Sequence, residues 1–286
     1  MITMYEWKLL IRHYWKIKKV NGPEKWTDLD YVGIDFNLDS YLVEIKRYQD
    51  RFKIKTCYSA EYNGKSYETL EIDWVGSQAK KKMMLSAGIH GNEIAGILAI
   101  PRVMQDISQN PEYYKDWEIK IITPVNPVGA SFLSRYNKDG YDINRDFRKD
   151  EYKTQEARKL VEIFSSFKPD MVVDMHEASQ PKGLIILANH SSSEEKTHEL
   201  AKRLDGKIEL AERHYMKTKL EVKGLEREGW FVIILERIFG ANNLQQVADD
   251  QRITSLTLES PWPEKDKEKR IVPHVVAFKE IVDVFK

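Results

Sequence analysis

The sequence predicts one α/β domain in which a twisted, mixed and largely parallel sheet carries helices on both faces. Three observations predict this fold class. The 286 residues suffice for one sizeable hydrophobic core. Short apolar runs alternate with amphipathic segments over most of the chain, as in sheets whose parallel strands are joined by helices. No internal repeat or low-complexity stretch interrupts this alternation, so we expect residues 1–286 to form a single domain.

Residues 1–30 differ from the rest of the chain. They are rich in aromatic and basic side chains and contain the break Gly22-Pro23, which predicts a short helix followed by a loop. We expect this stretch to be an N-terminal extension packed on or beside the domain. Its charged residues interrupt the apolar ones, so it lacks the continuous apolar core of a secretory signal and predicts a cytoplasmic protein.

The first elements of the domain are a helix and a hairpin. Residues 38–51 carry apolar side chains at helical spacing. Asn63-Gly64 is a strong turn dipeptide and predicts a hairpin over about residues 52–74. The remaining strands are predicted at 82–88, 117–124, 169–175, 184–188, 231–235 and 255–258, and the remaining helices at 93–107, 154–167, 192–204 and 272–285.

Composition argues against two classes of partner. Lys plus Arg and Asp plus Glu number 45 each, so no net field attracts nucleic acid or an anionic membrane surface. The longest apolar stretches are far shorter than the ~20 residues of a membrane-spanning helix. The single cysteine, Cys57, excludes an internal disulfide and a multi-cysteine metal site, and it is expected to be chemically inert.

Two of the predicted strands lead directly into histidines. The first strand after the hairpin is followed by His90-Gly91-Asn92-Glu93, and a later one by His176. Ligands collect at the carboxyl ends of parallel strands, so we expect these side chains to converge. Two histidines and a carboxylate, with a fourth position open to water, are the ligands of a hydrolytic zinc ion. We therefore predict a metal site made by His90, Glu93 and His176.

Zinc is the expected ion, at one per chain. Two imidazoles suit a borderline-soft ion, whereas magnesium favours oxygen ligands; iron, cobalt or nickel could occupy the same set. The helix-borne HExxH zinc motif is absent from the sequence. A single HxxE, or a single histidine after a strand, is more often structural. The joint placement of both at strand ends is what indicates a site.

Further motifs lie between and beyond the histidines. They are the Asn126-Pro127-Val128-Gly129 turn, Arg135, Asp142 with the Asn144-Arg145 pair, Asp174 before His176, and Glu259 after an apolar strand. In this order they resemble the M14 zinc carboxypeptidase family over about residues 50–286. The resemblance implies a zinc carboxypeptidase-like fold. It also implies a metallocarboxypeptidase, which removes a C-terminal residue by attack of zinc-activated water.

The resemblance also implies roles for the matched residues. Glu259 would take a proton from the attacking water and return it to the leaving amine. Arg135 would stabilise the oxyanion of the tetrahedral intermediate. Asn144 and Arg145 would hold the terminal carboxylate of the substrate, for which the guanidinium offers two parallel bonds. The expected substrate is thus a peptide or acyl amino acid with a free carboxylate.

Two carboxylates beside the histidines have supporting roles. Asp142 would accept the other ring N–H of His90 and so fix its liganding tautomer. Asp174 is either a similar partner or a cap at the end of a strand. Taken alone, Arg135 fits a surface ion pair with its neighbouring aspartates better than a catalytic role. The remaining histidines lack a companion at ligand spacing and are expected to be structural or exposed: His13, His190, His198, His214 and His274.

One part of the family pattern is missing. Pancreatic-type members carry a tyrosine on a mobile loop upstream of the catalytic glutamate, and residues 235–244 contain none. By counting along the chain, Leu244 falls where those enzymes line the specificity pocket. A leucine there predicts no strong preference for a charged side chain.

Two other functions stay open. The His-Gly-Asn-Glu and Asp-x-His motifs also resemble the aspartoacylases and succinylglutamate desuccinylases, which are N-acyl amino acid deacylases with the same metal ligands. Those enzymes usually continue into a β-rich C-terminal domain, whereas residues 260–286 leave room for one closing helix, so we favour the peptidase. The third hypothesis is a catalytically inactive binding module, which is disfavoured because every expected catalytic position is filled.

Overall fold

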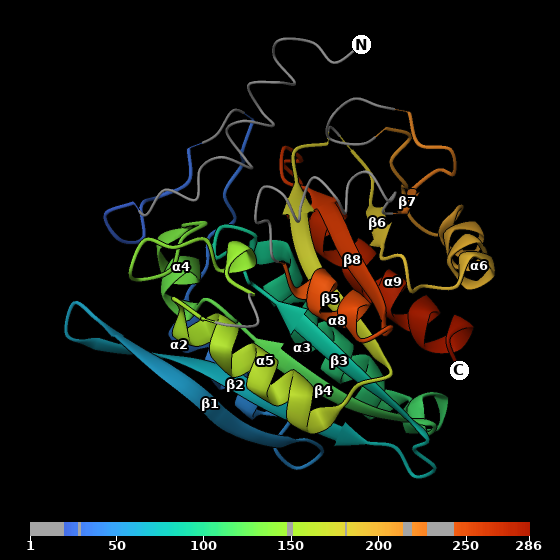
Figure 1. Ribbon diagram of the computed structural model, residues 1–286, viewed down its shortest axis with the longest axis horizontal. Helices are drawn as coiled ribbons and strands as arrows, with labels where there is room; N and C mark the ends of the chain where they lie inside the picture. The colour runs from blue at the N-terminus through green and yellow to red at the C-terminus, as the bar shows by residue number, and fades with distance from the viewer. Residues whose placement is uncertain (1–19, 28–29, 148–150, 181, 214–218, 228–242) are drawn as a thin grey trace.

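The computed structural model describes residues 20–27, 30–147, 151–180, 182–213, 219–227 and 243–286 (Figure 1). In these ranges an eight-stranded sheet has the strand order β1-β2-β4-β3-β5-β8-β6-β7. The strands are β1 (Lys53–Tyr62), β2 (Lys65–Val75), β3 (Lys81–Ala87), β4 (Trp117–Thr123), β5 (Met171–Ala178), β6 (Ile185–Ala188), β7 (Leu225–Arg227) and β8 (Thr254–Pro261). The α-helices are α2 (Leu38–Lys46), α3 (Ile94–Gln109), α4 (Pro127–Phe132), α5 (Gln155–Phe167), α6 (Glu194–Leu204), α8 (Leu244–Asp250) and α9 (Lys267–Val284).

The centre of the sheet is parallel, and its edges include antiparallel pairs. Strands β4, β3, β5 and β8 run parallel to one another. At one edge β1 and β2 form an antiparallel hairpin, and β2 pairs antiparallel with β4. Towards the other edge β6 is antiparallel to β8, while β7 is parallel to β6. The mixed, largely parallel sheet predicted from the sequence is therefore confirmed.

Helices cover both faces of this sheet (Figure 1). Helices α2, α3, α6 and α9 contribute to one large apolar cluster, which includes Leu85 of β3. Helices α5 and α8 contribute to a second cluster, which includes the adjacent Met84. Successive side chains of a strand point to opposite faces, so the nearly continuous apolar runs of the central strands supply both clusters.

The predicted hairpin lies within a residue of its expected bounds. Asn63 and Gly64 have φ angles of 49° and 75°, the left-handed backbone of a tight two-residue turn. The other elements differ in detail. Helix α2 ends at Lys46, short of the predicted residue 51. The elements that were not predicted are α4, α8, β7 and the 3₁₀ helices η1 (Pro111–Tyr114) and η2 (Ile143–Arg145).

The closing helix begins earlier than the sequence pattern predicts. Helix α9 starts at Lys267, not at residue 272, because the side chain of Asp266 caps it by accepting a hydrogen bond from the Glu268 amide. Pro273 lies inside the helix and does not end it. The strand predicted at 231–235 lies outside the described residues.

The predicted N-terminal extension is described only in part. Residues 1–19 and 28–29 lie outside the described ranges, so its assignment stays a prediction. Where residues 20–27 are described, the amide of Val20 donates to the Gly140 carbonyl, and that of Trp26 to the Leu133 carbonyl. Among the described residues, no helix combines the length and the apolar character needed to cross a bilayer.

Helix α3 approaches the sheet at a glycine. A Cβ on Gly96 would lie 2.7 Å from Met175 Cβ and 2.9 Å from the Met175 carbonyl oxygen. Real Cβ atoms do not make such contacts, so a larger side chain would push the helix away from β5. This contact sets the separation between the start of α3 and the strand that carries His176.

We predict that Gly96→Val destabilises the protein by about 1–3 kcal/mol, because the added methyl groups overpack the contact with Met175. Urea unfolding measures the change in the free energy of unfolding. Gln105→Val, at an exposed position of the same helix, is the matched control. It introduces the same side chain and should cost less than about 1 kcal/mol. Equal losses in the two variants would contradict the close-packing argument.

Candidate metal centre and active site

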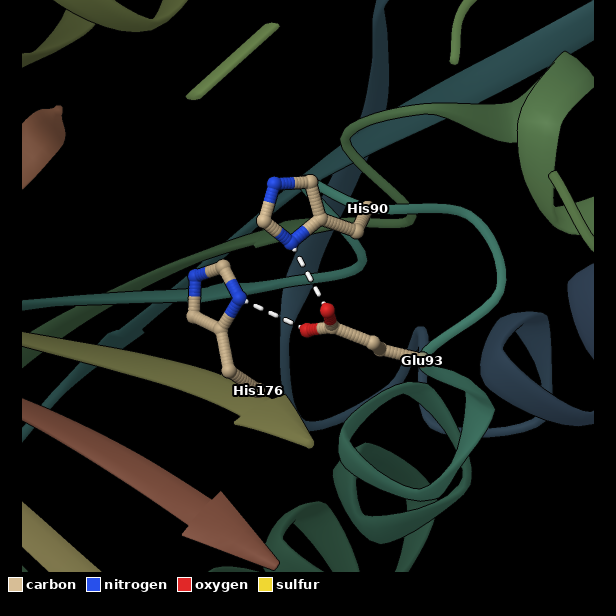
Figure 2. Close-up of side chains that lie close together, drawn as sticks. All are labelled: His90, Glu93 and His176. Carbon is tan, nitrogen blue, oxygen red and sulfur yellow. Dashed lines mark hydrogen bonds and ion pairs between the residues drawn. The ribbon is translucent and has the colours of Figure 1, made fainter. Parts of the chain in front are cut away.

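Three side chains predicted to bind a metal lie together. One candidate ligand atom from each of His90, Glu93 and His176 lies within 4.8 Å of the others, and all three residues are buried. Figure 2 shows both imidazole rings turned towards the Glu93 carboxylate, with Nδ1 of His90 at 2.8 Å and Nδ1 of His176 at 2.7 Å from its two oxygens. The three side chains therefore converge on one point.

Local backbone structure positions these groups at the carboxyl end of the sheet. His90 lies in the loop after β3, Glu93 is the N-cap residue of α3, and His176 lies near the end of β5. The loop passes very close to another motif, because a Cβ on Gly91 would lie 2.1 Å from the carbonyl carbon of Gly129. Two glycines therefore let the His-Gly-Asn-Glu loop rest against the start of α4.

Each histidine also contacts a carboxylate through its other ring nitrogen. Nε2 of His90 lies 3.1 Å from Asp142 Oδ1, and Nε2 of His176 lies 2.7 Å from Asp174 Oδ2. The second oxygen of Asp174 accepts a hydrogen bond from the Ser86 hydroxyl at 2.7 Å. Carboxylates in this position keep a proton on Nε2, so Nδ1, which faces Glu93, is the ring nitrogen that could coordinate an ion.

Arg135 lies beside the cluster. Its Nε donates to Asp142 Oδ2 at 2.8 Å, and its Nη1 lies 3.4 Å from His90 Nδ1 and 3.7 Å from Glu93 Oε1. Only 8% of the residue is exposed. The surface ion pair considered from the sequence is therefore wrong. Asp142 is the partner, as that hypothesis supposed, but the pair is buried beside the candidate metal ligands.

Glu259 comes from the neighbouring strand. It pairs with His176 in the parallel register of β5 and β8, so the two side chains project from the same face of the sheet. Among the described residues, its Oε2 is buried without a hydrogen-bond partner. A buried carboxylate oxygen with no protein partner is costly unless a ligand, an ion or water contacts it.

The Asn144-Arg145 pair is anchored to the same cluster through Asp142. In η2 the Asn144 amide donates to Asp142 Oδ1 at 3.0 Å, the oxygen that also faces His90. Arg145 Nη1 donates to the Asn144 carbonyl at 2.7 Å. Among the described residues, the side-chain oxygen of Asn144 has no hydrogen-bond partner. All eight predicted site residues thus meet at one end of the sheet.

The mutual charges of the cluster shift its pKa values in opposite directions. Burial raises the pKa of Glu93, but His90 and His176 outweigh it and hold this pKa far below its usual range. Burial lowers the pKa of His176, yet Asp174 and Glu93 raise it well above its usual value. Glu93 is therefore ionised, which is the form that can coordinate a metal.

The pKa of Glu259 is raised, whereas that of Glu93 is lowered. Burial raises the pKa of Glu259 to about 8; His176 opposes the shift, while Glu93 and Asp174 add to it. Asp142 is again held well below its usual pKa, because Arg135 and His90 outweigh its burial. Two carboxylates of one site thus have pKa values pushed far apart, an arrangement found where acid and base tasks are divided.

Several residues of the site carried no sequence signal. Glu177 follows His176, donates its amide to Glu93 Oε2 at 3.0 Å, and accepts from Arg270 Nε at 2.6 Å. Ninety-three positions separate Glu177 from Arg270 in the chain. No spacing rule could have paired them.

Leu244, which was predicted to line a specificity pocket, packs in the apolar interior. Leu244 is buried in the apolar cluster with α5 and α8, whereas its neighbour Gln245 accepts a hydrogen bond from Thr257, two residues before Glu259. The Nε2 of Gln245 is buried and has no partner among the described residues. Thr257 and Glu259 lie on the same face of β8, so the hydrogen bond to Thr257 places Gln245 on the face of the sheet that carries the site.

The other histidines and the cysteine lie elsewhere. His274 is buried with Nε2 at 3.0 Å from Ser260 Oγ, and His190 and His198 are exposed. His13 and His214 lie outside the described residues. Burial raises the pKa of the Cys57 thiol to about 12, so it is protonated and unreactive at neutral pH.

The donor set fits a transition-metal ion. Two imidazole nitrogens and one carboxylate are the protein ligands of hydrolytic metal sites, which keep a further position for water. Two carboxylates contact the imidazoles, and the Glu259 oxygen that has no partner among the described residues lies on the neighbouring strand. These residues could hold an ion, activate a nucleophile next to it and stabilise developing negative charge with Arg135.

Comparison with known sequences points to two groups of hydrolase. Residues 79–219 match the succinylglutamate desuccinylase/aspartoacylase catalytic domain. Carboxypeptidase 2 of Trichophyton tonsurans is 32% identical over 121 residues, which are 39% of this chain and 22% of that protein. Carboxypeptidase 2 of Trichophyton rubrum is 31% identical over 105 residues, 35% of this chain and 19% of that protein. The chain thus spans about a fifth of the length of these curated relatives.

Solved structures share the fold over most of the chain. A candidate metallopeptidase from Shewanella denitrificans has a TM-score of 0.68 at 14% identity, covering 90% of this chain and 98% of that one. A metallo-carboxypeptidase from Burkholderia cenocepacia has a TM-score of 0.67 at 13% identity, with 87% and 69% covered. One from Pseudomonas aeruginosa, solved with (2-guanidinoethylmercapto)succinic acid, has a TM-score of 0.65 at 15% identity, with 88% and 70% covered.

These findings confirm the resemblance drawn from the motifs. The fold is that of the metallo-carboxypeptidases, and the chain is similar in sequence both to carboxypeptidases and to the deacylase group. The similarity does not separate the two activities.

We predict that Asp174→Asn weakens metal binding by about 10- to 100-fold, because a neutral amide is a weaker acceptor for the Nε2 proton of His176 than the carboxylate. Competition with a chromophoric chelator measures the affinity. Asp170→Asn, at the exposed residue just before the same strand, is the matched control and should bind metal like the parent protein. If the two variants bind equally well, Asp174 has no role in orienting the ligand.

Proposed function

We propose that this protein is a zinc-dependent hydrolase of the metallocarboxypeptidase type, which cleaves a C-terminal peptide bond. The observation that carries the proposal is the buried cluster of His90, Glu93 and His176, with Glu259 and Arg135 beside it. A structural metal site would have a closed set of protein ligands. Three ligands next to a carboxylate oxygen that has no partner among the described residues suit catalysis.

The donor set supports zinc, one ion per chain, held by His90, Glu93 and His176. A bound zinc ion would supply Lewis acidity, which lowers the pKa of water to near neutrality and polarises a carbonyl group. Asp142 would fix the tautomer of His90, and Asp174 that of His176, because each carboxylate faces the Nε2 atom of its histidine. Magnesium fits less well, because it prefers an all-oxygen set.

Glu259 is the proposed general base and acid. It would accept a proton from the attacking water and then donate it to the nitrogen of the leaving amine, as the C–N bond breaks. Its pKa, raised by burial to about 8, suits a carboxyl group that must hold a proton between two steps. Its unpartnered Oε2 is the atom that would carry that proton.

Arg135 and Asp142 act as a unit in this proposal. The Arg135 guanidinium is buried and fixed by Asp142, so it is preorganised to stabilise the oxyanion formed when the carbonyl is attacked. Preorganisation matters because a donor that is already aimed needs no rearrangement in the transition state. Asp142 would thus support both Arg135 and His90.

Asn144 and Arg145 are proposed to bind the free carboxylate of the substrate. Both lie next to Asp142, and an arginine fork can make two charge-assisted hydrogen bonds to a carboxylate. This grip would select substrates that end in a carboxylate. It also explains why a carboxypeptidase and an N-acyl amino acid deacylase could use the same machinery.

The second candidate is an N-acyl amino acid deacylase. The match of residues 79–219 to the succinylglutamate desuccinylase/aspartoacylase catalytic domain favours it. Its substrates also present a carboxylate and an amide, so the proposed roles of Glu259, Arg135 and Arg145 would be unchanged. Only the group on the acyl side of the amide differs.

We predict that the protein purified without added ions contains zinc at one ion per chain, and that His176→Ala loses it. Glu259→Gln should keep the zinc but lower the rate constant of hydrolysis by about 100- to 10,000-fold, because the proton carrier is removed. Elemental analysis and steady-state kinetics measure the two effects. Glu195→Gln, exposed on α6, is the matched control and should alter neither.

Two results would contradict this assignment. A protein that binds no transition metal under metal-replete conditions has no zinc centre. Full hydrolytic activity in Glu259→Gln would show that this carboxylate is not the base, even if zinc is bound.

We predict hydrolysis of peptides with a free C-terminus and a loss of at least about tenfold when that terminus is amidated, because amidation removes the carboxylate that Arg145 would bind. Mass spectrometry of the products, with N-acyl amino acids assayed beside the peptides, gives the measurement. Arg145→Ala should raise KM for the free peptides. Cleavage of acyl amino acids alone would reject the carboxypeptidase and support the deacylase.

A further inference from the structure

The chain segment that precedes α2 lies against the active-site loops. This leading segment, residues 20–27 and 30–37, contacts the loop after α4 through Trp26, whose amide donates to the Leu133 carbonyl at 2.9 Å. It contacts the residues after β8 through the Val32 amide, which donates to the Trp262 carbonyl at 3.1 Å. Both contacts border the site built from Arg135 and Glu259.

Trp26 lies over the proposed oxyanion arginine. The Arg135 guanidinium carbon is 5.8 Å from the centre of the Trp26 ring system, within the range of a cation–π interaction. Trp26 is itself held by an edge contact with Trp262, whose ring centre is 6.4 Å away, and by a tilted contact with Tyr136 at 6.3 Å. Arg135 is thus held on one side by Asp142 and on another by an indole ring.

Tyr31 contacts the loop that carries His90 and Glu93, which we call the metal-ligand loop. Its hydroxyl donates to the Asn92 carbonyl at 2.7 Å, between the ligands His90 and Glu93 in the chain. Its ring packs edge-on against Trp262 with centres 6.1 Å apart. A hydrogen bond at this carbonyl restrains the backbone that must bring both ligands to one ion.

A buried ion pair between Arg270 and Glu177 is hydrogen-bonded to the leading segment. Arg270 is fully buried, and its Nη1 donates to the Val32 carbonyl at 2.6 Å while its Nε donates to Glu177 at 2.6 Å. Glu177 also accepts from the Ala95 amide at the start of α3, and its own amide donates to Glu93. The leading segment and the ligand Glu93 therefore share one polar network.

We propose that the leading segment is a built part of the active site, in which Tyr31 positions the metal-ligand loop and Trp26 positions Arg135. Both are positioning residues, since they act through Asn92 and Arg135. The inference rests on the proposed function and adds to it a part of the chain outside the motifs. It gives a positioning role to a segment that precedes all of the proposed site residues in the chain.

Metal affinity tests the first half without any need for a substrate. Tyr31→Phe removes only the hydroxyl, and its zinc affinity should fall about three- to tenfold in competition with a chelator. Tyr113→Phe is the matched control, because Tyr113 makes the same kind of bond to the Lys279 carbonyl away from the site. Its zinc affinity should equal that of the parent protein.

Kinetics test the second half. Trp26→Leu should lower kcat about tenfold with little change in KM or in zinc content, because the loss falls on a group that stabilises the transition state. Trp26→Phe keeps a ring over Arg135 and should recover most of the rate. Trp74→Leu, in the hairpin strand β2 and packed on Phe52, controls for the loss of any half-buried tryptophan and should keep the parent rate. Thermal unfolding of each variant identifies a general loss of folding.

The outcomes are distinct. Equal zinc affinity in Tyr31→Phe and Tyr113→Phe overturns the inference, and so does an equal kcat in Trp26→Leu and Trp74→Leu. Either result leaves the zinc hydrolase proposal intact, since that proposal is tested by the zinc content and the hydrolytic activity of the parent protein. A parent protein that binds no zinc overturns the proposed function and this inference together.

Discussion

The burial of charge is the constraint on which this structure depends. Glu93 lies between two imidazoles and is almost fully excluded from water, as are His90 and His176. A buried charge is tolerated only with partners that satisfy it. The cluster meets this requirement with alternating bases and carboxylates, so that removing one member would leave another uncompensated. The same alternation leaves the Nδ1 atoms pointing inward, which is where an ion would be bound.

Close backbone contacts make this charge arrangement possible. Gly91 packs against Gly129, and Gly96 packs against Met175, so closely that a Cβ atom on either glycine would clash. The first contact fixes the ligand loop against α4, and the second fixes the start of α3 against β5. Packing in the apolar interior thus decides the geometry of the polar site, since the ligands are carried by these elements.

Much of the fold and of the site could be predicted from the sequence for physical reasons. Hydrophobic periodicity is local, so it identified the central strands and most helices, and the left-handed turn at Asn63-Gly64 located the hairpin. The ligands lie immediately after or within apolar runs, so their position at the carboxyl edge of a parallel sheet followed from topology. The start of α9 did not follow, because a capping aspartate outweighed the apolar pattern.

By itself, the sequence determined the side chains of the candidate site, because the types and order of its proposed metal ligands, base and arginines are set by the order of residues in the chain. Only the tertiary structure decided how those groups are held. It placed Arg135 in the buried cluster and not at the surface, joined Glu177 to Arg270, and set Tyr31 and Trp26 against the catalytic loops. Contacts between segments far apart in the chain have no local signature, because they depend on how the packed elements bring side chains together.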